Sequence, residues 1–554
     1  MITLRSSRMA AAAIAVTLLV AACTASGASR QARQTDVNPH DSAALRDGGQ
    51  LRLAADQLPD NWNYYELDGP TGDGYRMIST VLPTLWAQNA DGTVRINKDF
   101  LESAELVSHE PQVIVFRLNP KARWSTGEPL SWEDFKAQVD ALSGARNDYK
   151  VASTTGYEDI ARVERGSTDR EVRITFKRKF AEWQTIFSPL YPASLYATAR
   201  EFNTGWLTSP KVTAGPFKIG SIDPVAQSVT VIRDPGWWGP RPRLDAITFR
   251  VIPKTALADS MAGGLIDSYG IGSNADLFGQ SQHIAGTVIR QVPATDYSTL
   301  VFNGKPGAIL DDAGLRIAVQ KGIDTKAITT TVLGRIAPDA KPLGNHLFLP
   351  TAKEYRDNSA IATFDPPAAR RELDSLGWKL DGDVRRKDGR ALVIRFVIGG
   401  GNALSRQISG MVQTQLRNIG AQVGIQTVPA ADYFRSYVNV GDFDISTFRW
   451  LVTAIPLTNS RGVYYLDPDN VNENYGKIGN RIINALFDEA TAELDGGKRA
   501  ALAQRIDREI WKEGSQLPLF QSSGAVAVRD TVANFGAAGY ASVPYDWVKV
   551  GFTR

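Results

Sequence analysis

The chain has 554 residues, of which 43% are hydrophobic, 22% charged and 9% aromatic. Its 62 basic and 59 acidic residues nearly balance, at a formal net charge of +3, which gives no electrostatic argument for nucleic-acid binding. Because single hydrophobic cores stop growing near about 250–300 residues, this length predicts more than one domain.

The first 22 residues have the composition of a lipoprotein signal peptide. Two arginines precede an apolar run over residues 9–22. This run is shorter than the about 20 residues that a membrane-spanning helix needs. Val20-Ala21-Ala22-Cys23 matches a lipobox, which predicts that Cys23 carries a lipid anchor on the extracytoplasmic face of the cell membrane. The alternative is an ordinary signal peptide followed by a chance cysteine.

A flexible tether is predicted to follow the anchor, so that residues 23–47 comprise the lipidated cysteine and this tether. Residues 24–47 are rich in Ala, Ser, Gln and Asp and lack apolar periodicity. Cys23 is the only cysteine, so a lipidated chain has no thiol left for a disulfide. The stability of the part from Gly48 onward must therefore come from packing.

Strands and helices are indicated along the folded part by apolar runs and by capping residues. Ser131 and Asp134 match a capping box and predict that a helix begins there. The dipeptide Asp365-Pro366 predicts a helix over 368–376, and an apolar stripe predicts another over 482–494. The predicted strands cover residues 112–118, 171–178, 246–252 and 392–398.

Residues 391–428 combine both kinds of element. A strand, a turn of three glycines, a helix over 404–418 and a second strand follow one another. This order is a βαβ unit, which is typical of a parallel or mixed sheet. The sequence therefore predicts an α/β protein.

The motifs of common catalytic and metal sites are absent from the sequence. The four histidines, at positions 40, 109, 283 and 346, are far apart and form no metal-binding pattern. The chain has no phosphate-binding P-loop, no G-x-S-x-G elbow and no S-x-x-K pair. We therefore expect no catalytic residues, no metal and no cofactor, and we expect that the protein is not an enzyme.

Short segments recur in the order that one protein family shows. They are Trp124-Ser125-Thr126-Gly127-Glu128-Pro129-Leu130, Thr213-Ala214-Gly215-Pro216-Phe217, Arg233-Asp234-Pro235-Gly236-Trp237-Trp238, Gly264-Leu265-Ile266-Asp267 and Gly441-Asp442-Phe443-Asp444. Taken together, from about Gly48 to the C-terminus, they resemble the family 5 extracellular solute-binding proteins of ABC importers. Each segment alone is weak, and the resemblance rests on their common order.

The resemblance implies a type II periplasmic-binding-protein fold, with two lobes around a hinge and an extra inserted domain. Lobe I would comprise residues 48–70, 213–302 and 535–554, and the inserted domain residues 71–212. Lobe II would comprise residues 303–534. The chain would then cross between lobes near residues 300–303 and 534–536.

The family also implies a function. An oligopeptide would bind in the cleft between the lobes, and the closed receptor, a monomer, would deliver it to ABC permease subunits that work with separate ATPases. Two alternatives stay open. One is a different ligand, such as a blocked peptide, haem, a glycan or lipid headgroup, or a metal chelate. The other is an envelope regulator with the same fold that transports nothing.

Two site residues follow from the peptide-binding branch of this family. In that branch, the motif G-x-F-D is followed by a tryptophan, and an aspartate three residues after this tryptophan pairs with the free amine of the ligand. The corresponding positions here are Trp450, predicted to be a wall of the site, and Thr453, which supplies no charge. An unpaired buried ammonium is costly, so amine recognition has moved, is lost, or the correspondence is off by one or two residues.

Further candidates come from the start of the folded part. Glu66 or Asp68 could supply the missing carboxylate, and Tyr64 and Tyr65 are aromatic rings of the kind that line ligand clefts. The alternative for such rings is core packing. Arg449 is a last candidate, and alternation along a strand would place it opposite Trp450.

Overall fold

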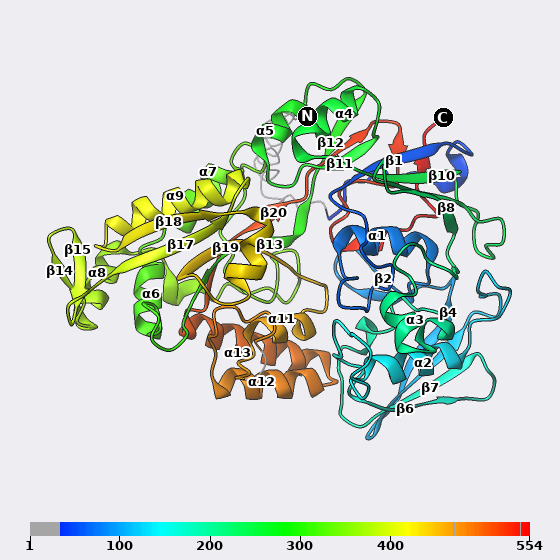
Figure 1. Ribbon diagram of the computed structural model, residues 1–554, viewed down its shortest axis with the longest axis horizontal. Helices are drawn as coiled ribbons and strands as arrows, with labels where there is room; N and C mark the ends of the chain where they lie inside the picture. Colours follow the sequence, from blue (N-terminus) through cyan, green and yellow to red (C-terminus); the bar gives the residue numbers. More distant parts are fainter. Residues whose placement is uncertain (1–33, 469–470, 543) are drawn as a thin grey trace, which may run out of the picture. The chain divides into compact units, whose positions relative to one another are not determined.

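The computed structural model describes residues 34–468, 471–542 and 544–554 (Figure 1). The predicted signal peptide, Cys23 and the tether up to residue 33 lie outside the described residues. The described chain is a mixed α/β structure built on a seven-stranded sheet, a five-stranded sheet and a four-stranded sheet.

The seven-stranded sheet has the strand order β12-β21-β11-β1-β10-β9-β8 and belongs to the first lobe. Its strand β1 pairs in parallel with β10 and buries Leu51 and Leu53, which alternate with less buried residues as a half-buried strand requires. The strands are β1 (Gln50–Ala55), β8 (Phe217–Asp223), β9 (Ser228–Arg233), β10 (Ala246–Val251), β11 (Ser268–Gly270), β12 (Thr287–Arg290) and β21 (Val526–Arg529). The helices of this part of the chain are α4 (Leu257–Ala262) and α5 (Ala275–Ser281), and α1 (Gly72–Val81), within the range expected for the inserted domain, contacts β8 of this sheet.

The inserted domain contains the four-stranded antiparallel sheet, in the order β4-β5-β7-β6. Its strands are β4 (Leu101–His109), β5 (Gln112–Leu118), β6 (Ile160–Arg165) and β7 (Glu171–Phe176), and a separate hairpin joins β2 (Trp86–Gln88) to β3 (Val94–Ile96). The helices are α2 (Trp132–Leu142) and α3 (Ala199–Thr204). The predicted capping box at the start of α2 is confirmed. The Ser131 side chain accepts from the backbone N–H of Asp134, and the Asp134 side chain accepts from the backbone N–H of Ser131.

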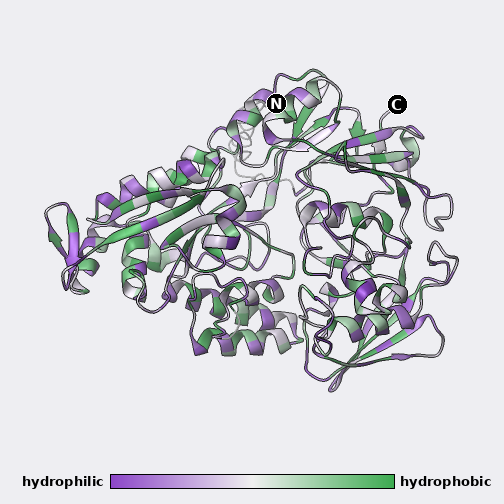
Figure 2. Cartoon of the chain, viewed as in Figure 1, coloured by the Kyte–Doolittle hydropathy of each residue, from purple (hydrophilic) through white to green (hydrophobic). Residues whose placement is uncertain are grey.

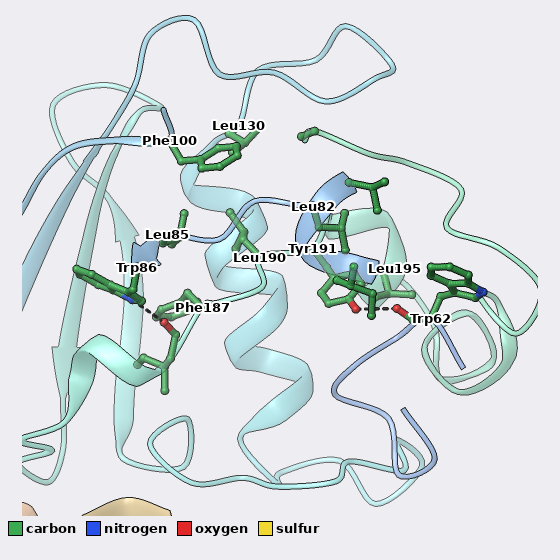
Figure 3. Close-up of a cluster of buried hydrophobic side chains, with 14 of the residues drawn as sticks. Trp62, Leu82, Leu85, Trp86, Phe100, Leu130, Phe187, Leu190, Tyr191 and Leu195 are labelled. Carbon is green, nitrogen blue, oxygen red and sulfur yellow. Dashed lines mark hydrogen bonds between the residues drawn. The ribbon is translucent and has the colours of Figure 1, made fainter. Parts of the chain in front are cut away.

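One hydrophobic cluster joins the first lobe to the inserted domain. It includes Leu53 and Phe249 of the seven-stranded sheet as well as Phe116 and Phe135 of the inserted domain. Figure 3 shows part of it, where the Tyr191 hydroxyl donates to the carbonyl oxygen of Trp62 at 2.7 Å. These two parts of the chain therefore share a core.

The five-stranded sheet, in the order β18-β17-β19-β13-β20, belongs to the second lobe and has its own core. The predicted βαβ unit is confirmed, since β17 pairs in parallel with β18 and α9 lies between them in the chain. The strands are β13 (Pro293–Phe302), β17 (Val393–Gly399), β18 (Gln422–Val428), β19 (Ile445–Leu451) and β20 (Gln516–Ser523). The helices are α6 (Ala313–Lys321), α7 (Thr325–Leu333), α8 (Pro366–Ser375), α9 (Ala403–Arg417), α10 (Ala430–Asp432), α11 (Leu457–Tyr464), α12 (Arg481–Ala492) and α13 (Gly496–Glu513).

Helices α12 and α13 form a pair with its own hydrophobic cluster. The apolar stripe predicted for α12 buries Ile483, Leu486, Phe487 and Ala490, and leaves Ile482 exposed. Figure 2 shows that both helices carry hydrophobic and hydrophilic residues, as expected for helices packed on one side. The remaining strands form small ribbons: β14 (Lys379–Asp381), β15 (Val384–Lys387), β16 (Arg390–Ala391), β22 (Val532–Ala533) and β23 (Gly551–Phe552).

The chain passes between the two large sheets at residues 291–292 and 524–525, where β12 gives way to β13 and β20 to β21. These positions lie about ten residues before the crossings expected near 300–303 and 534–536. The difference arises at two strands. β13 was assigned to the first lobe but pairs with β19 and β20 of the second, and β21 was assigned to the second lobe but pairs with β11 and β12 of the first. An apolar run identifies a strand, but it does not say which sheet the strand joins.

Residues 34–47, expected to be flexible tether, pack instead on the C-terminal part of the chain. Asp36 and Ala537 exchange backbone hydrogen bonds at 2.7 and 3.1 Å, and Leu45 is buried. The Asp36 carboxylate also accepts from the backbone N–H of Gln291, at one of the crossings between the sheets. Gly536 permits this approach, because its φ is +138° and a Cβ there would lie 2.9 Å from the Asp36 carbonyl oxygen.

Among the described residues, no helix combines the length and the apolar character that crossing a membrane requires.

Candidate ligand-binding site

A cavity of about 270 Å³ is lined by the inserted domain and by the second lobe. The inserted domain contributes the turn between β2 and β3 and the stretch that contains Glu182. The second lobe contributes the segment that follows β19 and the first turns of α13. Tyr540, from the C-terminal part of the chain, also lines it.

The lining of this cavity carries both signs of charge. Asp91, Glu182 and Glu354 supply carboxylates, and Lys353 and Arg499 supply cations. A ligand with an amine at one end and a carboxylate at the other would therefore meet opposite charges within one cavity.

A larger cavity, of about 510 Å³, lies within the inserted domain around the start of α2. Its charged lining residues are all acidic, and burial raises the pKa of one of them, Asp134, to about 6. Of the predicted site residues that the structure describes, none lines it. Because an enclosed ligand must touch the parts of the chain on both sides of it, we take the smaller cavity, which both the inserted domain and the second lobe line, as the candidate site.

Trp450 lies on β19 within a group of aromatic rings. Its ring stacks on Tyr475, with centroids 6.0 Å apart and planes within 10°, and meets Phe448 edge-on at 5.2 Å. The ring is only partly buried, and it packs against a hydrophobic cluster that includes Tyr540, a lining residue of the cavity. Trp450 does not itself line the candidate cavity, and its role as a wall of the site stays a prediction.

Gln516 of β20 fixes the orientation of this tryptophan. The indole Nε1 of Trp450 donates to the Gln516 side-chain oxygen at 2.9 Å. The Gln516 backbone carbonyl in turn lies 3.3 Å from Nε2 of the buried His346. No sequence pattern indicates Gln516, because its partner Trp450 lies 66 residues away in the chain.

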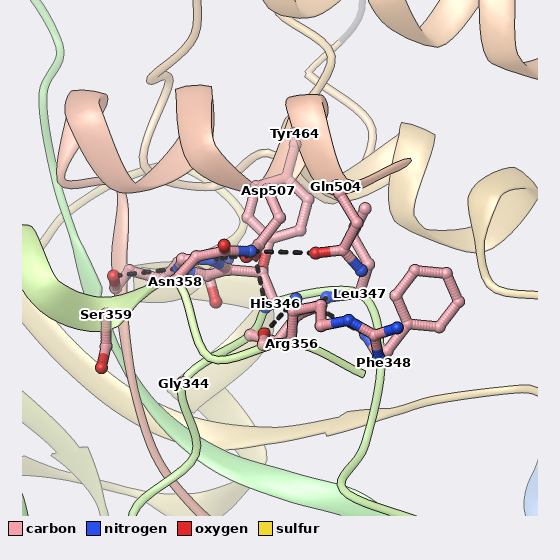
Figure 4. A network of polar contacts seen from close by, with 12 residues as sticks. Gly344, His346, Leu347, Phe348, Arg356, Asn358, Ser359, Tyr464, Gln504 and Asp507 are labelled. Atoms are coloured by element: carbon pink, nitrogen blue, oxygen red, sulfur yellow. Dashed lines mark hydrogen bonds and ion pairs between the residues drawn. The ribbon is translucent and has the colours of Figure 1, made fainter. Parts of the chain in front are cut away.

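His346 belongs to a buried polar network that ties the segment before α8 to α13 (Figure 4). Its Nδ1 lies 2.8 Å from the carboxylate of Asp507, and the side chains of both residues are fully buried. Asn358 donates to the other Asp507 oxygen at 2.6 Å. Since the Asp507 carboxylate is satisfied within the core, this pair supports the fold rather than a ligand.

Thr453 lines the cavity directly. Its hydroxyl donates to the backbone carbonyl of Ile455 at 2.7 Å, which leaves the hydroxyl oxygen as an acceptor. Thr453 brings no charge to the cavity, so the carboxylates in the lining, such as those of Asp91 and Glu354, belong to other segments.

Arg449 points away from Trp450, as strand alternation predicts. Its guanidinium donates to Asp296 of β13 at 3.0 Å, and its side chain is 52% exposed. Arg449 does not line the candidate cavity.

The candidates near the start of the folded part have different surroundings. Glu66 is buried, and one oxygen of its carboxylate accepts from the Asn61 side chain at 3.2 Å and from the Asp68 backbone N–H at 2.8 Å. The Asp68 side chain is exposed. Neither carboxylate lines the candidate cavity, so the structure does not bring them to Thr453.

Tyr64 and Tyr65 pack against the core that the first lobe shares with the inserted domain. The Tyr65 hydroxyl donates to the Pro189 carbonyl at 2.8 Å, and burial raises its pKa well above the usual value. The backbone N–H of Tyr64 donates to the Tyr191 hydroxyl, and burial also raises the pKa of the Tyr64 side chain. Their roles as ligand contacts stay predictions.

Glu182 is a lining residue that no sequence pattern indicates. Its two carboxylate oxygens accept from the backbone N–H groups of Leu457 and Thr458, at 3.0 and 2.6 Å. Burial raises the pKa of this carboxyl, while these donors and the charge of Arg499 lower it. Its partners lie about 275 residues away in the chain, and no local sequence pattern indicates them.

Within residues 34–468, 471–542 and 544–554, no group of three or more His, Cys, Asp or Glu side chains is arranged to hold a metal ion.

A family model for bacterial extracellular solute-binding proteins, family 5 (middle), matches residues 95–472. The chain belongs to this family. The family 5 resemblance predicted from the sequence is thereby confirmed. The oligopeptide-binding protein OppA of Mycobacterium tuberculosis is 39% identical over 555 residues, which cover 98% of this chain and 93% of that protein.

Solved structures of similar proteins support the same family 5 fold. A periplasmic EDTA-binding protein, EppA, superposes with a TM-score of 0.86 at 24% identity, over 94% of this chain and 98% of that chain. The oligopeptide-binding protein AppA from Bacillus subtilis, in complex with a nonapeptide, superposes with a TM-score of 0.78 at 19% identity, over 92% and 100%. The predicted α/β fold of the type II periplasmic-binding class is confirmed.

Membership in family 5 fixes the general activity. Proteins of this family are extracellular solute-binding proteins, so the chain is a solute-binding protein. The charged side chains of both signs that line the cavity suit that role.

Proposed function

We propose that this family 5 protein is an oligopeptide-binding receptor of an ABC importer, anchored by a lipid on Cys23 at the extracytoplasmic face of the membrane. The observation that carries the proposal is the 39% identity, over 98% of the chain, to a protein named for binding oligopeptides. An extended peptide would satisfy its main chain by hydrogen bonds and lay its side chains against surfaces such as the Trp450–Tyr475 wall.

Native mass spectrometry of the purified protein tests the ligand. Peptide receptors with little sequence preference retain mixtures, so we expect a ladder of bound masses whose fragments are peptides. A single bound mass that does not fragment as a peptide would contradict the proposal. Addition of a defined peptide to the unfolded and refolded protein should then give one new peak of the expected mass.

A second candidate ligand is a metal chelate. The EDTA-binding neighbour shares the fold, Thr453 brings no charge for an amine, and Lys353 and Arg499 could pair with carboxylates of a chelate. The two ligand classes are separated by titrating the ligand-free protein with a tetrapeptide and, in parallel, with Fe(III)-EDTA. Heat from the peptide alone supports the first proposal, and heat from the chelate alone supports the second.

The anchor is tested apart from the ligand. Cells fed an alkyne fatty acid should label the wild-type chain and not a Cys23→Ser variant, and that variant should leave the membrane fraction. Delivery to a transporter predicts that the anchored protein co-purifies with permease subunits after cross-linking. Labelling of both forms would refute lipidation at Cys23.

A further inference from the structure

A two-residue stretch of the inserted domain contacts two helices of the second lobe. The backbone N–H of Ala181 donates to the carbonyl oxygen of Thr491, in the last turn of α12, at 2.7 Å. The next residue, Glu182, accepts from the first two residues of α11, Leu457 and Thr458. Successive residues thus hold the end of one helix and the start of the next.

Helix α11 lacks a cap of its own. Its N-cap residue is Pro456, which makes no side-chain capping hydrogen bond. The first N–H groups of a helix have no partner within the helix, and the positive end of the helix dipole favours an anion there. The Glu182 carboxylate supplies the acceptor for these N–H groups and also the negative charge, so a residue of one domain caps a helix of another.

Because Glu182 is buried, its hydrogen bonds to α11 form only while the inserted domain lies against the second lobe. Glu182 is only 1% exposed, and a carboxylate that leaves water needs hydrogen bonds or an opposite charge to offset its lost hydration. Here the two N–H donors and the nearby Arg499 provide them. If the inserted domain moved away from α11, the carboxylate and the two N–H groups would lose these hydrogen bonds and would need water molecules as partners instead.

The same contact borders the candidate ligand cavity. Glu182 and the run from Thr453 to Leu457 line it, and the turn between β2 and β3 approaches this run at Gly92. Gly92 has φ of +81°, and a Cβ there would lie 3.4 Å from the Cβ of Ala454. Both approaches bring the inserted domain onto the segment that connects β19 to α11.

We propose that Glu182 is an interdomain latch, which caps α11 in trans and thereby holds the inserted domain against the second lobe around the cavity. The latch acts with or without ligand. The latch proposal rests on the proposed function in one respect: it assumes that the ligand fills this cavity. Loss of hydrogen bonds to a charged group should lower the ratio of closed to open molecules by roughly 10- to 100-fold.

Pulsed electron–electron resonance on the ligand-free protein measures this ratio. The chain produced from Thr24 onward includes every described residue and contains no cysteine. Spin labels at Lys177→Cys in the inserted domain and Lys498→Cys on α13, both exposed positions, therefore report one distance. We expect E182A and E182Q to add a population at longer distance, and unchanged distributions for both variants would overturn the latch.

A matched control is E164Q, because Glu164 is an exposed glutamate of the same domain and pairs only with Arg162 among the ion pairs described. This variant should leave the distances unchanged. A shift equal to that of E182Q would show a general effect of lost charge and would overturn the proposal.

Hydrogen exchange on the unlabelled protein gives a second measure that does not depend on the labels. In E182Q the amides over 457–464 should exchange faster, while the amides of β5 and β7 in the inserted domain should keep their protection. Faster exchange throughout the inserted domain would mean that the variant unfolds it, and equal exchange over 457–464 would mean that no latch exists.

These results are separable from those on the ligand. A protein that retains no peptide but opens in E182Q would keep the latch and lose the peptide proposal. If the cavity takes the ligand, E182Q should weaken every ligand by the same factor, because it lowers the closed population that binds.

Discussion

Two groups of aromatic side chains, one around Trp450 and one around Tyr65, are packed in opposite ways. Tyr65 lies edge-to-face with Tyr157 and Tyr191, and the Tyr65 and Tyr191 hydroxyls both donate to backbone carbonyls. Trp450 stacks flat on Tyr475 at a partly exposed position. The Tyr65 hydroxyl is therefore used within the fold, whereas the Trp450 ring keeps an exposed surface.

This difference shows what distinguishes a site from a core when the residue types are the same. Flat rings with a polar edge serve both purposes. What separates them here is their surroundings: the Tyr65 hydroxyl is used by a backbone carbonyl within the fold, whereas charged side chains such as Asp91 and Arg499 line the cavity.

The largest expected effect is on ligand affinity at the Trp450 wall. Trp450→Ala removes a central aromatic surface and should weaken peptide binding roughly 10- to 100-fold, measured by isothermal titration. Trp450→Phe keeps a ring to stack on Tyr475 and should retain most of the affinity. Equal affinities of the wild type and Trp450→Ala would remove this side chain from the site.

The next effect is on stability in the Tyr65 region. Glu66→Ala leaves the Asn61 amide and the Asp68 backbone N–H without their buried acceptor, which should lower the free energy of unfolding by about 1–3 kcal/mol. Urea unfolding measures this change. Asp68→Ala alters an exposed side chain and serves as the control. If Glu66→Ala lost peptide affinity but no stability, Glu66 would be a ligand contact rather than a residue that stabilises the fold.

Thr453 should control selectivity for a free amine. Thr453→Asp places a carboxylate in the cavity lining and should improve the affinity for a free-amine peptide over its N-acetylated form by about tenfold. Thr453→Asn has a similar shape without the charge and should not change this ratio. An unchanged ratio in Thr453→Asp would place the peptide amine elsewhere.

The smallest effect is expected at Arg449, which lies on the other side of β19 from Trp450. Exposed ion pairs contribute little, so Arg449→Ala should change the unfolding free energy by less than about 1 kcal/mol. Titration should show an unchanged peptide affinity. A tenfold loss would mean that the ligand reaches both sides of the strand.

Local signals predicted the elements whose cause is local. The capping box at Ser131, the βαβ unit with α9, and the apolar stripe of α12 all depend on residues within a few turns of one another, and all three are present. The crossing between sheets was expected about ten residues too late, since the apolar run of β13 does not reveal its partner strands.

The site could be predicted only in part, for the same reason. Resemblance to family 5 pointed to Trp450 and Thr453, and the structure places Thr453 in the cavity lining. Gln516 and Glu182 act on groups 66 and 275 residues away, so their roles exist only after folding. Glu66 was singled out for its charge, which its neighbours in the fold already use.

The docking of Asp36 beside Gln291 has a mechanical consequence. If Cys23 holds the lipid, only 13 residues separate the membrane from Asp36, a span of at most about 45 Å. A pull on the anchor would then act next to a segment where the chain crosses between the two large sheets, so that it would exert little torque on a movement of one sheet relative to the other. Tension at the membrane would then have little effect on the balance between open and closed molecules.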